Sequence, residues 1–213
     1  MSNPAETLAG KFIVIDGPDG AGKTTQAGLL AEFLAESGLE VQRIRDPGGT
    51  EIGDEIRAIL LDNRHHNMSV QCELMLYMAS RAQLAREVIA PSLAAGKCLL
   101  GDRYVSSTIA YQGAGGADVE AIMLAARIAV GDAMPDLTII LDIDSETGLA
   151  RAARVGAADR IESKQIEYHR RVREIFLSQA QNDPQHYAVI SGLGSIEEIQ
   201  QQLRNTLATR NWS

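Results

Sequence analysis

The hydrophobic positions of this 213-residue chain fall into short apolar runs separated by longer amphipathic stretches. Short apolar runs are typical of strands buried on both faces, and they predict strands at 11–16, 39–44, 97–100, 137–143 and 187–190. Apolar residues at helical spacing predict helices at 23–37, 50–61, 69–95, 117–130, 145–155, 162–181 and 195–208. In the last helix Ile196, Ile199, Leu203 and Leu207 share one face, and Ser195 with Glu198 predicts a capping box at its start.

Strands that alternate with helices predict an α/β fold, in which helices cover both faces of a parallel sheet. We therefore expect a three-layer arrangement around a central five-stranded parallel sheet. No internal repeat or linker interrupts the pattern, so residues 1–213 are expected to form a single domain. Ligands of such sheets bind beyond the carboxyl ends of the strands, and residues that directly follow a strand are the first candidates for chemistry.

Composition and charge narrow the possible partners. The net charge of −8 disfavours a general nucleic-acid-binding protein, because phosphate backbones attract basic surfaces. Cys72 and Cys98 lack the spacing of a metal site, which favours buried thiols in a reducing compartment. The sequence shows no signal peptide and no apolar run long enough to cross a bilayer. We expect a cytoplasmic protein that binds neither nucleic acid nor membrane.

Residues 17–24 carry the phosphate-loop sequence G-x-x-x-x-G-K-T, directly between a predicted strand and a predicted helix. The glycines allow several backbone N–H groups to point at one phosphate, and the helix start adds its positive dipole end. Lys23 should reach the β- and γ-phosphates, and the Thr24 hydroxyl can ligate Mg²⁺. The motif predicts a P-loop NTPase fold with these ATP-binding residues: Gly17, Pro18, Asp19, Gly20, Ala21, Gly22, Lys23, Thr24 and Thr25.

A second pair of candidates follows the predicted strand 97–100. Asp102 can organise Mg²⁺ or its waters, and the planar guanidinium of Arg103 suits a phosphate. A structural Asp–Arg pair at the strand end is the alternative. The position beside the phosphate loop favours a functional role.

Tyr77 and Arg81 are four residues apart, so they share one face of the predicted helix 69–95. A ring beside a guanidinium could hold a flat base by stacking and hydrogen bonding. Spacing alone favours the plainer alternative, in which Tyr77 packs in the core and Arg81 is exposed.

Three arginines, Arg151, Arg154 and Arg160, bracket Gly156 in a segment that could close as a lid over residues 151–162. Phosphoryl transfer needs positive charge near the transferred group, and a mobile lid would supply it only when closed. The same arginines would fit a solvated helix face equally well.

Several stretches taken together resemble the bacterial thymidylate kinase family. They are residues 15–25, 45–50 (Arg-Asp-Pro-Gly-Gly-Thr), 76–81, 101–104 (Gly-Asp-Arg-Tyr), 107–112, 135–138 and 159–162. They occur in order over nearly the whole chain. The resemblance implies transfer of the γ-phosphoryl group of ATP to dTMP, giving dTDP, with Mg²⁺ and in a homodimer.

The resemblance also implies roles for individual residues. Tyr77 would stack on thymine, Arg81 would donate to its O4 edge, and Tyr111 would lie under the sugar. The residues implied to bind dTMP are Asp19, Arg45, Pro47, Tyr77, Arg81, Arg103, Ser107, Thr108, Tyr111 and Gln112. Those implied to hold Mg²⁺, directly or through water, are Thr24, Asp19 and Asp102. The catalytic residues would be Lys23, Asp19, Arg103, Arg154 and Arg160.

Two positions depart from the family pattern. Asp46 stands where most relatives carry Glu, and Val155 stands directly before Gly156, where relatives often carry an arginine. A shift of one residue rotates a helical side chain by about 100°. Because the phosphate loop itself holds no arginine, we expect Arg154 to meet the transferred charge, with Arg160 second and Arg151 third.

Two other functions stay open at this point. A kinase for a different small acceptor would need a different base pocket, because a donor such as Arg81 suits O4 of thymine and opposes the amino group of cytosine. A nucleotide-driven switch would hydrolyse NTP slowly and need no acceptor site. ATP turnover with and without dTMP separates these readings.

Overall fold

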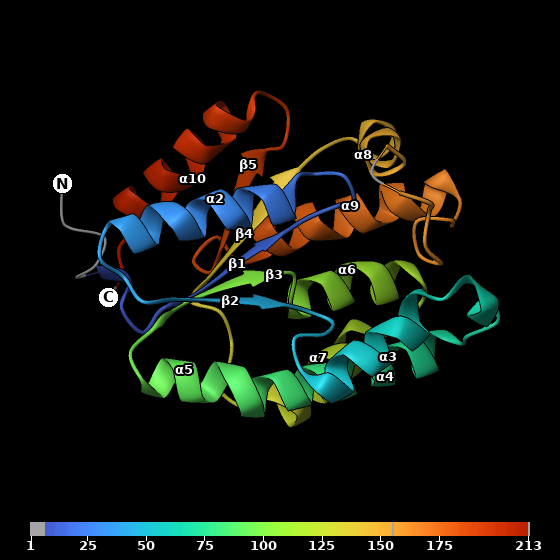
Figure 1. Ribbon diagram of the computed structural model, residues 1–213. Helices are drawn as coiled ribbons and strands as arrows, with labels where there is room; N and C mark the ends of the chain where they lie inside the picture. Colours follow the sequence, from blue (N-terminus) through green and yellow to red (C-terminus); the bar gives the residue numbers. More distant parts are fainter. Residues whose placement is uncertain (1–6, 155, 213) are drawn as a thin grey trace.

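The computed structural model describes residues 7–154 and 156–212, and a parallel sheet forms its centre (Figure 1). The strand order is β2-β3-β1-β4-β5, and every neighbouring pair is parallel. The prediction of a five-stranded parallel sheet is confirmed. The strands are β1 (Phe12–Asp16), β2 (Val41–Arg45), β3 (Cys98–Asp102), β4 (Leu137–Asp142) and β5 (Tyr187–Ser191).

Helices connect the strands close to the predicted positions. Their bounds are α2 (Lys23–Glu36), α3 (Glu51–Leu61), α4 (Val70–Leu84), α5 (Ala90–Ala94), α6 (Val105–Ala114), α7 (Val119–Val130), α8 (Ser145–Ala152), α9 (Ile166–Asn182) and α10 (Ile196–Thr209). A 3-10 turn, η1 (Asn63–His65), precedes α4, and a π-helical turn, η2 (Ala85–Ile89), joins α4 to α5 within the predicted helix 69–95. Helix α6 was not predicted. The capping box at Ser195 is confirmed.

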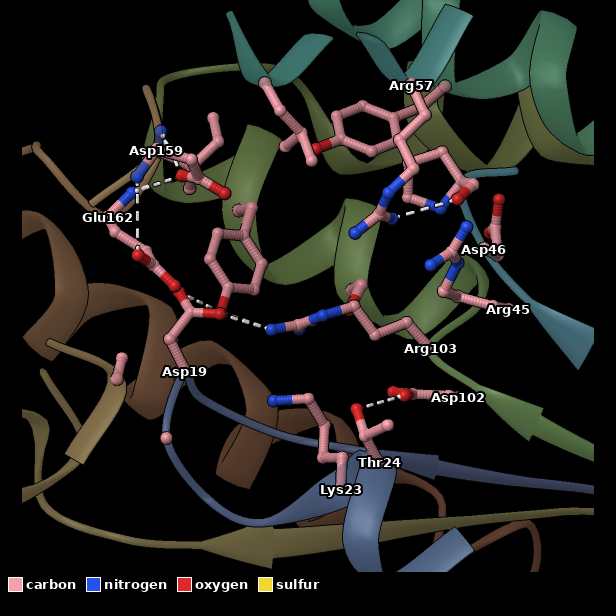
Figure 2. A pocket seen from close by; sticks show the side chains of 18 of the residues that line it. Asp19, Lys23, Thr24, Arg45, Asp46, Arg57, Asp102, Arg103, Asp159 and Glu162 are labelled. Atoms are coloured by element: carbon pink, nitrogen blue, oxygen red, sulfur yellow. Dashed lines mark hydrogen bonds and ion pairs between the residues drawn. The ribbon is translucent and has the colours of Figure 1, made fainter. Parts of the chain in front are cut away.

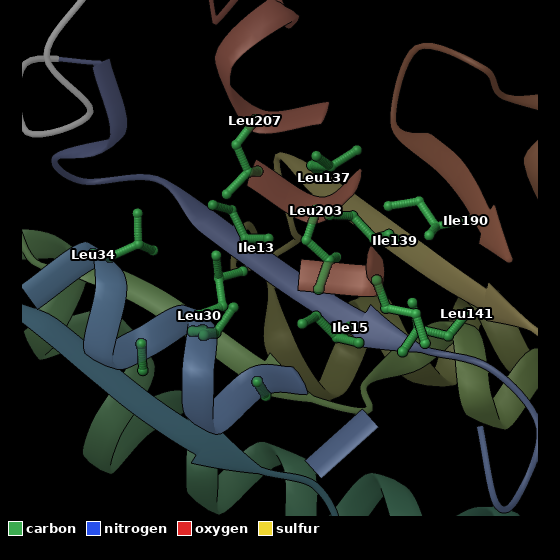
Figure 3. Packing of buried hydrophobic residues seen from close by; sticks show 14 of the residues in the cluster. Ile13, Ile15, Leu30, Leu34, Leu137, Ile139, Leu141, Ile190, Leu203 and Leu207 are labelled. Atoms are coloured by element: carbon green, nitrogen blue, oxygen red, sulfur yellow. The ribbon is translucent and has the colours of Figure 1, made fainter. Parts of the chain in front are cut away.

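The core is divided by the sheet, as the alternation of strand side chains requires. On one face Ile13 and Ile15 of β1 pack with Leu30 of α2 and with α10 (Figure 3). On the other face Phe12 and Val14 pack with side chains from α4 and α7. Both faces of β1 are buried, which explains why its sequence is uniformly apolar.

The strand register sets the position of the candidate site. Strand β1 lies between β3 and β4, and Ile15 pairs with Asp102 across the sheet. The residues after β1 and β3 are therefore neighbours at the carboxyl edge. Within the two described ranges, no helix combines the length and apolar character that crossing a membrane would require.

Candidate active site

A cavity of about 600 Å³ opens at the carboxyl edge of the sheet. Its walls come from the loops after β1, β2 and β3 and from α3, α4, α6 and α8. Figure 2 shows many of the lining side chains pointing toward a common space. The predicted residues that line it are Asp19, Gly20, Gly22, Lys23, Thr24, Thr25, Arg45, Pro47, Tyr77, Arg81, Asp102, Arg103, Ser107, Thr108, Tyr111 and Gln112.

The phosphate loop forms the floor of this cavity. Gly17, Gly20 and Gly22 have positive φ angles of 133°, 72° and 90°, a region that glycine enters easily and other residues rarely. Helix α2 begins at Lys23, so its unpaired N–H groups face the loop. The Lys23 ammonium donates to the Pro18 carbonyl over 2.6 Å, and burial lowers the pKa of Lys23 to about 8. Phosphate oxygens would restore the stability of its charged form.

Beside Lys23, the Thr24 hydroxyl donates to the Asp102 carboxylate over 2.6 Å. The prediction that Asp102 lies near the phosphate loop is confirmed. Their oxygens are hard donors of the kind that Mg²⁺ accepts. Among the described residues no group of three or more His, Cys, Asp or Glu side chains could hold a metal.

Arg103 lies at the centre of the cavity with a φ of 68°, a left-handed conformation that a residue with a side chain adopts only when its surroundings impose it. Its guanidinium forms an ion pair with Asp19 and donates to Ser107 Oγ over 3.0 Å. The Tyr111 hydroxyl donates to the other Asp19 oxygen over 2.8 Å. Burial alone would raise the pKa of Asp19, but Arg103 and Lys23 hold it below its ordinary value. Asp19 is thus ionised and fixed on Arg103.

The wall formed by α4 contains Tyr77 and Arg81, as the helical spacing predicted. Arg81 is only 1% exposed, so the alternative in which it lies on the surface is wrong. Its Nε donates to Asp46 over 2.6 Å and its Nη2 to Thr108 Oγ1 over 3.0 Å. Burial raises the pKa of Asp46, and Arg81 opposes that shift. The loop after β2 is therefore attached to the α4 wall of the cavity through a buried ion pair.

Comparison with known proteins agrees with this geometry. The thymidylate kinase family model matches residues 15–203. The chain belongs to the thymidylate kinase family. A thymidylate kinase of Pseudomonas putida is 41% identical over 92% of this chain and 94% of its own length. A thymidylate kinase of Exiguobacterium sibiricum is 40% identical over 95% of this chain and 96% of its own. The crystal structure of thymidylate kinase from Ehrlichia chaffeensis superposes with a TM-score of 0.78 at 31% identity, covering 94% of this chain and 100% of that one.

In this member of the thymidylate kinase family the arginines at positions 151, 154 and 160 occupy three different environments. Arg151, at the end of α8, lines the cavity and donates to the Gly192 carbonyl over 3.0 Å. Arg154 is exposed and does not line the cavity. Arg160 is buried, and its Nη2 lies 2.5 Å from Oε2 of Glu73. Val155 lies outside the described residues. Which arginine meets the transferred charge stays a prediction.

Sequence reasoning missed lining residues that come from the sides of helices and from the segment 159–162. Arg57 of α3 donates to the Pro47 carbonyl over 3.0 Å, and its side chain enters the cavity together with Arg45 and Arg103 (Figure 2). Asp159 and Glu162 line the opposite side. Burial and the neighbouring Arg45 lower the pKa of Arg57. Arg57 lies inside α3, twelve residues after the end of β2, and belongs to no motif that would mark it in the sequence.

A close backbone contact fixes α8 on the phosphate loop. A Cβ atom added to Gly148 would overlap the Asp19 carbonyl oxygen, and one added to Gly20 would overlap the Gly148 carbonyl oxygen. Both positions therefore require glycine. This contact holds the helix that carries Arg151 directly against the loop that carries Lys23.

Proposed function

We propose that this chain transfers the γ-phosphoryl group of ATP to dTMP, giving dTDP and ADP, as a step in dTTP synthesis. The observation that supports this most strongly is a single cavity shared by a phosphate loop and a pocket suited to a base. Lys23, the Asp19–Arg103 ion pair, Tyr77 and Arg81 all line this cavity. A nucleotide switch would need only the first of these parts.

The reaction follows from the positions of the charged groups. An oxygen of the dTMP phosphate bonds to the γ-phosphorus of ATP, and the bond from that phosphorus to the β–γ bridging oxygen breaks, so the electron pair leaves with ADP. Arg45, Arg57 and Arg103 would hold the acceptor phosphate, and Lys23 would offset charge on the bridge. Asp19 would keep Arg103 oriented and, with the phosphate bound, would itself face the acceptor.

The donor set at the phosphate loop fits Mg²⁺. Thr24 and Asp102 offer two oxygens 2.6 Å apart, and Asp19 could contribute through water. Mg²⁺ keeps several of its waters and needs few direct protein ligands when a triphosphate supplies further oxygens. When bound, the ion would neutralise charge on the triphosphate. We propose Thr24 as its direct ligand and Asp102 as a ligand through water.

Base selection would rest on the α4 and α6 wall. Tyr77 would stack on thymine, and Thr108 and Gln112 would lie along its edge. Arg81 would have to reach O4 while its Nε donates to Asp46. This hydrogen bond would restrict the guanidinium to one orientation. Tyr111, fixed by Asp19, would crowd a 2′-hydroxyl.

We further propose a single domain with a lid at about 151–162, and a homodimer in solution. Helix α4 packs between α3 and α7, and these three helices carry exposed apolar side chains. They are Ile52, Ile59, Met75, Leu124 and Ile128, the last 80% exposed. Apolar residues gathered on one side of a molecule mark an interaction surface, and the family resemblance supports a second copy as the partner. Light scattering should report a dimer. The use of free nucleotides supports a cytoplasmic location.

The test is ADP formation from ATP with each nucleoside monophosphate in turn. We expect turnover to require an acceptor, with dTMP preferred, dUMP weaker and dCMP rejected. One methyl group in an apolar pocket contributes about 1–3 kcal/mol, so dUMP should be disfavoured and not excluded. Equal ATP turnover without any acceptor would support a switch, and preference for another monophosphate would support a different kinase.

A further inference from the structure

The buried acid Glu73 lies behind the base pocket and does not line it. It stands on α4, one turn before Tyr77, and is 2% exposed. A carboxylate removed from water is destabilising unless charged and hydrogen-bonding partners surround it. The side chains that contact Glu73 therefore indicate which role this buried carboxylate has.

Three side chains from two other segments meet this carboxylate. Oε1 accepts a hydrogen bond from Gln112 Nε2 over 2.6 Å, and Arg160 Nη2 lies 2.5 Å from Oε2. Lys164 Nζ lies 3.9 Å from Oε1. Arg160 is itself fixed, because its Nε donates to the Leu60 carbonyl over 2.8 Å. A guanidinium, an ammonium and an amide N–H group thus surround the Glu73 carboxylate and fix its direction.

The position of the Glu73 carboxylate determines which end of the Gln112 amide group faces it. An ionised carboxylate only accepts hydrogen bonds, so Gln112 must present its NH₂ group to Glu73 and its carbonyl oxygen elsewhere. Gln112 lines the cavity, and no described residue donates to its Oε1. The free group that Gln112 offers to a base is therefore an acceptor.

An acceptor at this place distinguishes pyrimidines by their N3 atom. Thymine and uracil carry a hydrogen on N3 and can donate it, whereas N3 of cytosine is an acceptor and would oppose Gln112 Oε1. We propose that Glu73 is a positioning residue that sets the amide of Gln112 and thereby selects bases with N3–H over cytosine. This inference rests on the proposed dTMP kinase function and concerns the same site.

The experiment measures kcat/KM for dTMP, dUMP and dCMP in the full chain and in Glu73→Gln. A glutamine at 73 can donate as well as accept, so Gln112 would be free to turn. We expect the dTMP-to-dCMP ratio to fall roughly 10-fold to 100-fold, because a mismatched buried group no longer opposes cytosine. The KM for ATP should not change. Glu146→Gln is the matched control, because it removes an acid paired with Arg170 at the surface and should leave the ratio unchanged.

The exchanged variant Glu73→Gln/Gln112→Glu gives a sharper readout. Its glutamine would donate to the new carboxylate, whose second oxygen would again accept from N3–H. We expect this variant to recover selectivity that Glu73→Gln loses, which a merely structural role would not produce. If Glu73→Gln does not fold, Gln112→Met tests the same idea and should lower the ratio.

Retention of wild-type selectivity in folded Glu73→Gln, or in Gln112→Met, would overturn the inference. So would failure of the exchanged variant to improve on Glu73→Gln. Failure of the proposed function looks different, since the wild-type chain itself would then show no dTMP-dependent turnover.

Discussion

The contact between Gly148 and the phosphate loop offers a direct test of how the site is assembled. Gly148 lies inside α8, where alanine is about 1 kcal/mol more favourable than glycine by helix propensity. An added Cβ would come well inside 3.0 Å of the Asp19 carbonyl oxygen, closer than real Cβ atoms approach. Any damage from Gly148→Ala therefore comes from this overlap, since the helix itself favours the change.

The size of the effect follows from what must move. The overlapped atom is backbone, so either α8 or the loop at Asp19 must shift by several tenths of an ångström. Overpacking of this kind costs about 1–3 kcal/mol, which the gain in helix propensity partly offsets. A misplacement of about 1 Å in a catalytic array can lower the rate 10²-fold. We expect kcat to fall roughly 10-fold to 100-fold, while the melting temperature changes little.

The assay follows ADP formation at saturating ATP and dTMP, with thermal unfolding measured on the same preparations. Gly28→Ala in α2 is the control, since its Cβ would meet only the Arg43 guanidinium at 3.8 Å. It should keep wild-type kcat. Wild-type kcat in Gly148→Ala would refute the reasoning, because it would show that the loop tolerates displacement.

Three further predictions concern charged groups in or near the cavity. Arg103→Lys keeps the charge but loses the planar fork, so calorimetry should show weaker dTMP binding with ATP binding largely spared; an equal loss for both would contradict this. Because the pKa of Lys23 falls from 10.5 to about 8 on folding, ATP affinity should weaken above pH 8 and binding near pH 9 should take up a proton, which calorimetry in two buffers measures. The unfolded chain binds more protons in that window, so unfolding free energy should rise with pH from about 8 to 10.5. Alanine variants of Arg151, Arg154 and Arg160 should be compared on kcat, and full kcat in all three would exclude a lid arginine.

The sequence was sufficient for the sheet because buried parallel strands leave an unmistakable apolar pattern. The five predicted strands match the observed ones to within about two residues at each end. Helix α6 was missed for a physical reason. All residues from Val105 to Gln112 are buried, polar ones included, so no alternation between exposed and buried faces marks the helix.

Site residues at the ends of strands could be predicted from the sequence. Site residues that are positioned by the packing of helices could not. Lys23 comes after β1, Asp102 ends β3 and Arg103 follows it, and the strand register brings these residues together without further information. Arg57 reaches the cavity, and Gly148 contacts the phosphate loop, only because α3 and α8 pack where they do. Neither residue belongs to a motif that would mark it in the sequence.

The sequence did not decide which of Arg151, Arg154 and Arg160 meets the transferred charge, and the burial of each arginine now ranks them. For Arg160 to act on the transferred phosphoryl group it would have to leave Glu73, and breaking a buried ion pair costs about 3–5 kcal/mol. Arg151 would give up only one hydrogen bond to a carbonyl oxygen, and Arg154 is exposed beside the lid glycine. The energetic ordering therefore favours Arg151 or Arg154 as the mobile charge. Arg160 is better suited to anchoring the proposed lid. Its loss would leave the Glu73 carboxylate without its guanidinium partner and would loosen the Gln112 amide in the proposed base pocket.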